Sequence, residues 1–221
     1  MIWSTAWPDI VATHSLRLSG DRFRIRPVDL ADAARILALR TDAKLARYLN
    51  PTSPSLAEQE RWIEQYLERD GDFYFVVEDA SNGVFEGAIA LYHCDRDSRQ
   101  AEMGRWILRR GSLAAAQSAL LVYQLAFDEV CLDRVYCQTV ADNRSVVSFH
   151  RSCGLRESGR DLRVVLADGE HQVVEQYVDR SNWAHVAATL RRAAASADRL
   201  LDRASADRLV DRVFADRLVD R

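Results

Sequence analysis

The sequence has no long apolar run, and none of its windows approaches the ~20 apolar residues that a membrane-spanning helix needs. Its start, Met1-Ile-Trp-Ser-Thr-Ala-Trp-Pro, lacks a basic segment followed by an apolar core, so we expect no signal peptide. The four cysteines form no C-x-x-C pair, and no cluster with metal-ligand spacing follows His93-Cys94-Asp95. These absences predict a cytoplasmic protein with reduced thiols, no metal and no membrane partner.

The sequence also lacks a large excess of charge. A formal net charge of −3 provides no global basic field, so we expect no nucleic-acid partner, although a local basic patch stays open. The sequence contains no nucleophile elbow combined with a Ser-His-Asp or Cys-His order of residues. This absence favours chemistry without a covalent enzyme intermediate. With 221 residues, 48% apolar and 29% charged, the chain suits one globular domain plus terminal material.

The apolar pattern predicts an α+β chain built on a single mixed sheet. Asp29 and Ser55 are expected helix N-caps, and Gly87 is expected at a bulge or a close backbone approach. The predicted strands are 16–28, 73–77, 85–93, 100–108, 135–140, 163–166 and 173–178. The predicted helices are 29–40, 55–70, 115–130 and 143–154, with a short helical piece at 42–49 counted into the first.

The end of the chain repeats itself with a period of nine residues. Ala197-Asp-Arg-Leu-Leu-Asp-Arg203 recurs from Ala206 and again from Ala215. Nine residues are 2.5 helical turns, so successive repeats point to opposite faces and build no single apolar stripe. A charged helix of marginal stability or disorder is expected, and an oligomerisation or membrane-surface helix is the alternative. The predicted parts are an extension (1–14), a domain (15–180) and this tail (181–221).

The segment Glu102–Leu155 organises the predicted domain. It reads as a strand, a small-residue turn that opens a helix, a second strand, and a second helix that ends in glycine. The turn between Leu108 and Ala115 directs free N–H groups and the positive end of the helix dipole to one place. This geometry predicts a site for an anionic group.

Two motifs in this segment resemble those of the GNAT superfamily of acyl-coenzyme A N-acyltransferases. The pyrophosphate loop of that family, Arg/Gln-x-x-Gly-x-Gly/Ala, is matched by Arg110-Gly-Ser-Leu-Ala-Ala115, with Leu113 in place of a glycine. A second motif is matched by Asn143-Arg-Ser-Val-Val-Ser-Phe-His-Arg-Ser-Cys-Gly-Leu155, with His150 where the family often has tyrosine. The resemblance covers about 16–178 and implies a splayed mixed sheet flanked by helices, with acetyl-coenzyme A as acyl donor.

The resemblance implies roles for particular residues. Main-chain groups of the strand beside the cofactor and the loop after it are expected to bind acetyl-coenzyme A: Ile107, Leu108, Arg109, Arg110, Gly111, Ser112, Leu113, Ala114 and Ala115, together with Asn143. The side chains of Arg105 and Arg109 are expected either to face the phosphates or to face solvent.

Three residues are candidates for proton transfer in a direct attack of the amine on the thioester. His150 is the candidate proton donor to the leaving thiolate or a proton relay, because a histidine with a pKa near neutrality could do either. Glu102 is the candidate general base and His93 is the alternative base. Tyr48 and Asn50, in the loop between the first two helices, are expected to bind the acceptor.

Two branches of the family fit, and they differ in acceptor. The nucleotide-amino-sugar N-acetyltransferases of flagellin glycan (pseudaminic acid) biosynthesis are similar in the Arg40–Tyr48 segment, the degenerate pyrophosphate loop and the late hairpin. The ribosomal-protein N-terminal acetyltransferases are similar in length and in a Gly-x-Trp-Ile/Leu strand. A nucleotide-linked amino sugar is the expected acceptor, with a protein N-terminus or a small amine as alternatives. A non-catalytic acyl-coenzyme A-binding module and a homo-oligomer stay open.

Overall fold

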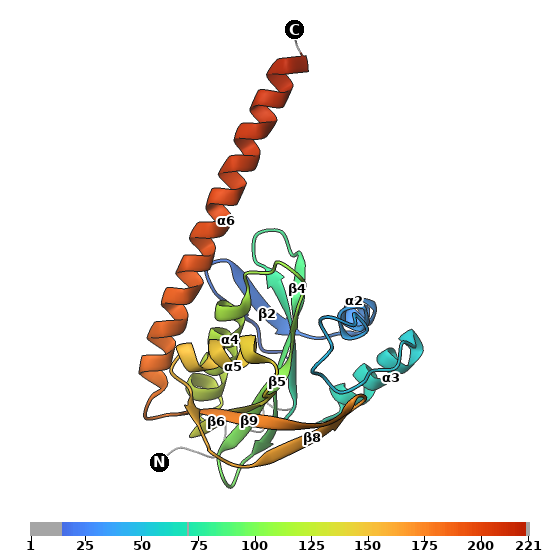
Figure 1. Ribbon diagram of the computed structural model, residues 1–221, viewed down its shortest axis with the longest axis vertical. Coiled ribbons are helices and arrows are strands. Elements are labelled where there is room, and N and C mark those ends of the chain that lie inside the picture. Colours follow the sequence, from blue (N-terminus) through green and yellow to red (C-terminus); the bar gives the residue numbers. More distant parts are fainter. Residues whose placement is uncertain (1–14, 70, 220–221) are drawn as a thin grey trace.

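The computed structural model describes residues 15–69 and 71–219, with side chains described as far as residue 203. Within these residues, nine strands form one mixed sheet with helices on both faces (Figure 1). The strands are β1 (Leu18–Ser19), β2 (Phe23–Pro27), β3 (Phe73–Asp79), β4 (Phe85–Asp95), β5 (Gln100–Leu108), β6 (Arg134–Val140), β7 (Arg156–Glu157), β8 (Leu162–Leu166) and β9 (Gly169–Asp179). The helices are η1 (Leu30–Asp32), α2 (Ala33–Arg40), α3 (Leu56–Leu67), α4 (Ala115–Gln124) with its π-helical end η2 (Leu125–Glu129), α5 (Arg144–Ser152) and α6 (Trp183–Val219).

The sheet runs in the order β1-β2-β3-β4-β5-β6-β9-β7, and β8 pairs with β9 outside this path. Every pairing is antiparallel except that of β5 with β6. Connecting two neighbouring parallel strands requires a crossover, and α4 provides it. The predicted mixed sheet and the predicted order of strands and helices are thus confirmed.

Two hydrophobic cores hold the three layers together. One lies between the sheet and α4, α5 and α6, and the other lies between the sheet and α2 and α3 (Figure 1). β3 is buried along its whole length because both cores cover it. The two faces of the sheet therefore receive different helices, which separates the α4–α5 side of the molecule from the α2–α3 side.

Helix α6 begins at Trp183 and runs along the α4 side of the sheet (Figure 1). Val186, Ala187, Leu190 and Ala194 are buried in the first core. The packed domain therefore extends past the boundary expected at residue 180. The expected extension at 1–14 lies outside the described residues, as do the side chains from 204 on. None of the described helices is long and apolar enough to cross a membrane.

The short helix predicted at 42–49 is wrong, because this segment forms a series of turns. The Asp42 carboxylate accepts hydrogen bonds from the N–H groups of Lys44 (2.9 Å) and Leu45 (3.1 Å). A side chain that satisfies nearby backbone donors competes with a helix for them. The segment from Asp42 to Ser55 is therefore a loop that connects α2 to α3, and we call it the α2–α3 loop.

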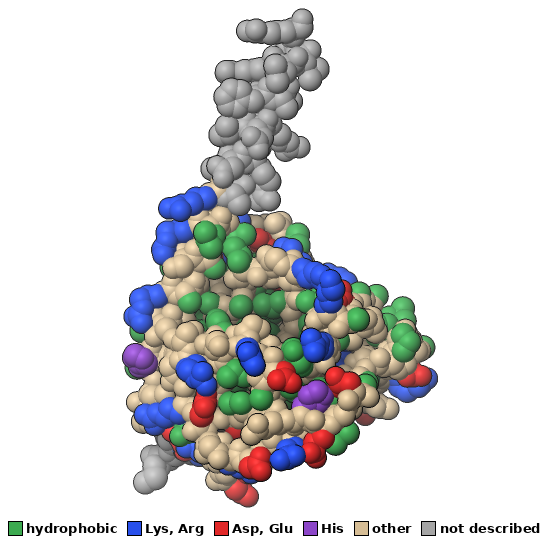
Figure 2. Space-filling view, in the orientation of Figure 1, with side chains coloured by type: hydrophobic (Ala, Val, Ile, Leu, Met, Phe, Trp, Pro, Cys, Tyr) green, Lys and Arg blue, Asp and Glu red, His purple; other side chains and the backbone are tan. Residues whose placement is uncertain are grey.

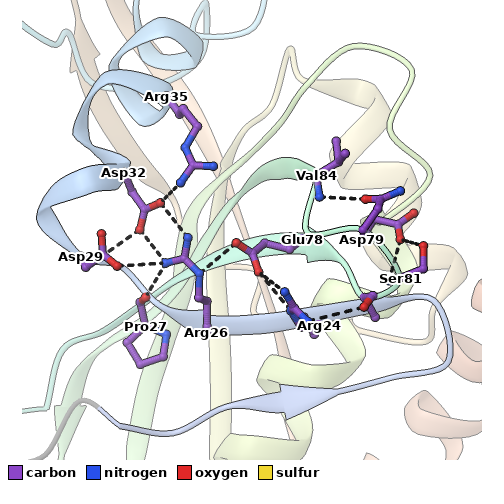
Figure 3. Close-up of polar contacts among 12 residues, drawn as sticks. Arg24, Arg26, Pro27, Asp29, Asp32, Arg35, Glu78, Asp79, Ser81 and Val84 are labelled. Atoms are coloured by element: carbon purple, nitrogen blue, oxygen red, sulfur yellow. Dashed lines mark hydrogen bonds and ion pairs between the residues drawn. The ribbon is translucent and has the colours of Figure 1, made fainter.

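An arginine–carboxylate network fixes the start of α2 against the sheet (Figure 3). Arg26 binds the carboxylates of Asp32 (2.7 Å) and Glu78 (2.9 Å), while Arg24 binds the other oxygen of Glu78 (3.0 Å). Asp29 caps η1 as expected, through the N–H of Ala31, and the side chain of Asp32 accepts from the Asp29 N–H. Buried carboxylates need such partners because an unpaired charge is costly to bury.

Gly87 lies in β4 where the backbone of β5 approaches it closely. A side chain there would place its Cβ 2.2 Å from the carbonyl oxygen of Ile107 and 2.7 Å from the Cα of Leu108. The pairing of β3 with β4 also shifts register opposite this residue, between Val77 and Glu78. The expected bulge and close backbone approach are both present, and they fix the position of the last residues of β5.

Candidate active site

The parallel pair β5–β6 is open for most of its length. Pairing is confined to Gln100–Arg134, Ala101–Val135 and Glu102–Tyr136. From Met103 on, β5 continues along β4, while β6 continues along β9. The main-chain groups on the two facing edges then have no strand partner across the gap, so a ligand can reach them. This is the splay that the sequence resemblance implied.

A bulge in β5 lies beside this gap. Arg105 and Trp106 together stand opposite Ile89 of β4, and the backbone of Arg105 has φ 45°. The Arg105 guanidinium makes a two-pronged ion pair with the buried carboxylate of Asp72, at 2.5 and 2.9 Å. The side chain of Arg105 therefore holds the bulge in place. Its main partner is Asp72, rather than the phosphate or solvent that the sequence left open.

Three aromatic rings surround the same guanidinium. Its central carbon lies 4.3 Å from the ring centre of Tyr92, 5.2 Å from that of Trp62 and 5.7 Å from that of Tyr74. A cation over an aromatic face is attracted by the ring quadrupole. The aromatic cage and Asp72 together keep the bulge in one conformation.

Ile107 and Leu108, which are expected to offer main-chain groups to the thioester, point their N–H groups in opposite directions. The N–H of Arg109 donates to the carbonyl of Glu86 at 2.8 Å, so this pair is hydrogen-bonded across β4 and β5. Hydrogen-bonded and non-bonded pairs alternate along antiparallel strands. Ile107, paired with Ala88, therefore turns its N–H toward β4, whereas Leu108 turns its N–H toward the gap. The geometry favours Leu108 over Ile107 as the donor to a ligand.

A cavity of about 740 Å³ opens from the gap, and we call it the central cleft. Residues of β4, β5, β6, α3, α5, the α2–α3 loop and the β8–β9 hairpin line it. It brings together six of the residues selected from the sequence: Tyr48, Asn50, His93, Glu102, Asn143 and His150. Apolar side chains lie across the middle of the molecular face in Figure 2, between separate side chains of both charges.

Glu102 and His93, which were expected as alternative bases, lie side by side in the cleft. One carboxylate oxygen of Glu102 accepts the hydroxyl of Tyr92 at 2.7 Å, and the other lies 3.3 Å from Nδ1 of His93. The Glu102 side chain is 14% exposed, whereas that of His93 is 69% exposed. Nδ1 of His93 is thus directed to the carboxylate, which leaves Nε2 for a ligand.

Backbone strain accompanies this pair. His93 has φ 52° and lies where the register between β4 and β5 shifts, between Tyr92 and Asp95. The ring of Tyr92 covers Gly104, where a Cβ would come 2.7 Å from the tyrosine hydroxyl oxygen. Positive φ at residues other than glycine is uncommon and is often found at functional sites.

His150 is buried on the other side of the cleft. Its Nδ1 lies 3.1 Å from the Cys137 thiol, and its ring stacks on Trp106 with 5.8 Å between ring centres. Burial lowers the pKa of His150 to about 4, against a smaller opposing effect of Gln176. The imidazole is therefore neutral at pH 7, and the condition of a pKa near neutrality, on which its role as a proton donor depended, is not met in this environment. Its role in proton transfer stays a prediction.

Two ring nitrogens at this place, Nε2 of His150 and Nε1 of Trp106, are buried without a hydrogen-bond partner among the described residues. Burying a polar group without a partner costs free energy, so native proteins usually satisfy such groups. Because both side chains line the cleft, a bound ligand can supply the missing partners. This observation fits a cofactor whose thioester end lies between β5 and α5.

The predicted pyrophosphate loop lies outside the lining of the cleft, at the start of α4. Ala114 is the N-cap residue and provides no side-chain cap, so the first N–H groups of the helix are not satisfied in that way. Gly111 has φ 75° and open space around it. The N–H groups of Ser112 and Ala114 are bonded to Arg109 and to the Ser112 side chain, respectively. The loop therefore fits an anion chiefly through the other N–H groups of Arg110–Ala115.

The two arginines of this loop already have carboxylate partners. Arg109 pairs with the buried side chain of Glu86 at 2.6 Å, and Arg110 pairs with Asp42 of the α2–α3 loop at 3.2 Å. Both Arg110 and Asp42 are on the surface, whereas Glu86 is 3% exposed. Arg110 is therefore the arginine that is free to move toward a phosphate.

The other predicted contacts lie on the cleft wall. Asn143 is the N-cap of α5, and its side-chain oxygen accepts from the Ser145 hydroxyl at 3.0 Å. Arg47 lies over the ring of Tyr48, with 5.1 Å to the ring centre. The carbonyl of Asn50 accepts from Arg40 at 3.2 Å. Sequence reasoning missed Tyr92, Trp62 and Cys137, since their positions depend on strand register and on contacts across the sheet.

Residues 22–156 match the family described as an acetyltransferase (GNAT) domain, which is more than half of the chain. The chain belongs to the GNAT family. It is therefore an acetyltransferase, and acetyl-coenzyme A is the donor that this family uses. Among the described residues, no group of three or more His, Cys, Asp or Glu could hold a metal ion.

The names of curated and structural relatives of this GNAT enzyme indicate several different acceptors. A candidate ribosomal N-acetyltransferase of Bacillus subtilis, YdaF, is 27% identical in an alignment 170 residues long that covers 71% of this chain and 90% of that protein. FdhC, a nucleotide-linked sugar GNAT, superposes with a TM-score of 0.67 at 24% identity, covering 77% and 93% of the two chains. A spermidine N-acetyltransferase of Vibrio cholerae, solved in complex with CoA and spermine, superposes with a TM-score of 0.68 at 21% identity. The match covers 75% of this chain and 99% of that chain. The two structural likenesses show the fold alone.

Proposed function

We propose that this GNAT enzyme transfers an acetyl group to the amine of a nucleotide-linked amino sugar. The observation that carries the proposal is the Tyr92–Glu102–His93 cluster at the point where β5 and β6 separate. Acetyl-coenzyme A supplies a thioester as the acyl donor. An amine that attacks the thioester carbonyl must be neutral and must lose a proton, and this cluster offers an acceptor for that proton.

In this proposal the residues of the chain have separate tasks. His93 accepts the proton from the attacking amine through Nε2, and Glu102 orients and stabilises the resulting imidazolium. The N–H of Leu108 and the ring nitrogens of Trp106 and His150 are the nearby groups available to polarise the carbonyl or to bind the sulfur. The C–N bond forms and the C–S bond breaks, the amine proton passes to His93, and coenzyme A leaves as a thiolate. The thiolate takes up one proton, returned by His93 or supplied by solvent, so the products are an amide and the free thiol of coenzyme A.

The charges of the cleft support an acceptor that carries negative charge. Among the described residues that line it, the fixed charges are those of Arg40, Arg69, Arg105, Glu58 and Glu102. Arg69 and Arg105 both contact the carboxylate of Asp72, whereas Arg40 binds the neutral Thr52 hydroxyl and Asn50 carbonyl. Arg40 is therefore the cation of the cleft that suits a diphosphate better than a polycation such as a polyamine. The likeness to a nucleotide-linked sugar GNAT and the segment Arg40–Tyr48 point the same way.

The second candidate is a protein N-terminus or a small amine. It is favoured by YdaF, whose name carries a ribosomal activity and which matches 71% of this chain. A peptide acceptor would need to reach the same base at His93 and Glu102, so the chemistry would be unchanged.

Release of free thiol from acetyl-coenzyme A, measured against a panel of amines, tests the proposal. The panel contains nucleotide-linked amino sugars, peptides with ribosomal-protein N-termini, and polyamines. We expect the highest kcat/KM for a nucleotide-linked amino sugar. A higher kcat/KM for a peptide or a polyamine would overturn the proposed acceptor while leaving the acetyltransferase chemistry intact.

A further inference from the structure

A second hollow of about 490 Å³ lies next to the central cleft, on the face of β5, β6 and β9 that is opposite α4 and α5. We call it the outer hollow and define it by Gln100, Arg134, Tyr136, Gln138, Glu175 and Tyr177. The alternation of β6 explains its position, because Val135 and Cys137 point into the core while Arg134, Tyr136 and Gln138 point away.

The outer hollow and the central cleft share a wall. His93 and Gln138 line both of them. Tyr136 is the partner of Glu102 in the last paired position of β5 and β6, and partners in parallel strands point to the same face. The hollow therefore begins beside the Glu102–His93 pair, and a molecule in it can present a group to His93.

The charged groups of the hollow already have partners of their own. Arg134 binds Asp179 at 2.7 Å, and Arg160 at the rim lies 3.3 Å from Glu175. Gln138 also donates to Glu175 at 3.1 Å, so this carboxylate, which is 8% exposed, is held from two sides. Asp95 also lines the hollow, and its carboxylate accepts from the Ser98 hydroxyl and from the N–H of Asp97, so its partners are neutral donors within its own turn. No guanidinium without a carboxylate partner is available for a diphosphate among the residues that line the hollow.

The remaining groups are neutral hydrogen-bonding side chains beside aromatic rings. Gln100, Gln138 and the Tyr136 hydroxyl can each donate and accept, and Arg134 stacks over Tyr177 at 4.2 Å, which fixes that ring. An apolar ring face next to neutral donors and acceptors matches a sugar, which has apolar C–H faces and hydroxyl groups at its edge.

We propose that the outer hollow is an acceptor subsite that takes an uncharged, hydroxylated ring, as in the sugar of a nucleotide-linked amino sugar. The inference rests on the proposed function, since it gives the sugar a place from which its amine reaches His93. The charged part of such an acceptor then extends toward the arginines of the central cleft.

Three variants test the subsite without changing the catalytic pair. Tyr136→Ala and Gln100→Leu remove contacts to the ring, and Tyr136→Trp fills the hollow. Each should raise KM for a nucleotide-linked amino sugar about tenfold, equivalent to ~1.4 kcal/mol. KM for acetyl-coenzyme A and for a small alkyl amine should not change. Gln172→Leu, at an exposed position of β9 outside the hollow, is the matched control.

A binding measurement separates this inference from the proposed function. Saturation-transfer NMR with free glucosamine needs no turnover, so it reports on the subsite even if the wild-type enzyme acetylates no amino sugar. We expect contact with the wild type and its loss in Tyr136→Trp, with thermal melting to confirm folding. Equal glucosamine contact in the wild type and in folded Tyr136→Trp would overturn the subsite. An absence of turnover on amino sugars would overturn the proposed acceptor alone.

Discussion

Nδ1 of His93 lies 3.3 Å from the carboxylate of Glu102, on a residue whose backbone has φ 52°. The other oxygen of the same carboxylate is occupied by the Tyr92 hydroxyl. A carboxylate that binds one ring nitrogen fixes the orientation of the imidazole and stabilises its charged form. In the proposed function the two side chains act as one unit for proton transfer, and this has a measurable consequence.

Glu102→Gln and His93→Ala should each reduce kcat by about 10²-fold, the typical contribution of a positioned base. The double variant should be little slower than either single variant, because groups that act as a unit are not additive. Steady-state thiol release measures all three. His171→Ala is the matched control, since His171 forms a similar pair with Asp168 at 2.8 Å away from the cleft lining. Fully additive losses would contradict a shared role.

The burial of His150 predicts a pH dependence of stability. Its pKa is about 4 in the folded protein against 6.5 for an unperturbed histidine, so between these values the unfolded chain binds more protons. Stability therefore rises with pH across this window and is lost as pH falls, by up to about 3 kcal/mol. Urea unfolding at pH 4.5 and pH 7 should show this loss in the wild type. His150→Phe, which keeps a ring beside Trp106, should show a smaller loss. An equal loss in both proteins would exclude His150 as its source.

Much of the fold follows from the sequence because periodicity and caps are local signals. The strands, the helix that opens at Ala115 and the N-cap at Asp29 all depend on residues that are near one another in the chain. The 42–49 segment was mispredicted because its apolar spacing is helical, whereas the Asp42 side chain takes up the N–H groups of Lys44 and Leu45. Periodicity alone does not reveal that competition.

The candidate site was predicted only in part, for a similar reason. Glu102 and His93 could each be selected by residue type, but their contact depends on the register between β4 and β5. Arg105 was selected from the sequence only as a contact to phosphate or solvent, because its positive φ and its pairing with Asp72 arise from a bulge that the sequence does not reveal. The low pKa of His150 depends on burial against Trp106, which two separate segments create.

The Asp72–Arg105 ion pair should be important for stability. Asp72→Ala leaves the Arg105 guanidinium, which is 19% exposed, without its partner inside the aromatic cage. Breaking a buried pair on one side typically costs ~3 kcal/mol or more. Urea unfolding should therefore show a much larger loss than Glu157→Ala, which breaks the exposed Arg151–Glu157 pair and should cost under ~1 kcal/mol. Similar losses in the two variants would mean that the cage does not depend on its counter-ion.

Asp42 and Arg110 connect the acceptor side to the predicted pyrophosphate loop, and their contact of 3.2 Å predicts competition with the cofactor. If Arg110 turns to a phosphate, it must leave Asp42. Asp42→Asn keeps an oxygen for the N–H groups of Lys44 and Leu45 but removes the charge that holds Arg110. KM for acetyl-coenzyme A should therefore fall by about two- to threefold in Asp42→Asn and rise by about tenfold in Arg110→Ala, since a charge-assisted hydrogen bond is lost.

The double variant distinguishes this competition from a general effect of charge. Without Arg110 there is no guanidinium to release, so Asp42→Asn in the Arg110→Ala background should leave KM for acetyl-coenzyme A unchanged. If Asp42→Asn lowers KM equally in both backgrounds, the carboxylate acts on the phosphates by long-range repulsion instead. Such repulsion weakens with ionic strength over a Debye length of about 8 Å at 0.15 M salt. Repeating the KM measurement at high salt therefore distinguishes the two causes: the transfer of Arg110 from Asp42 to a phosphate, and long-range repulsion of the phosphates by Asp42.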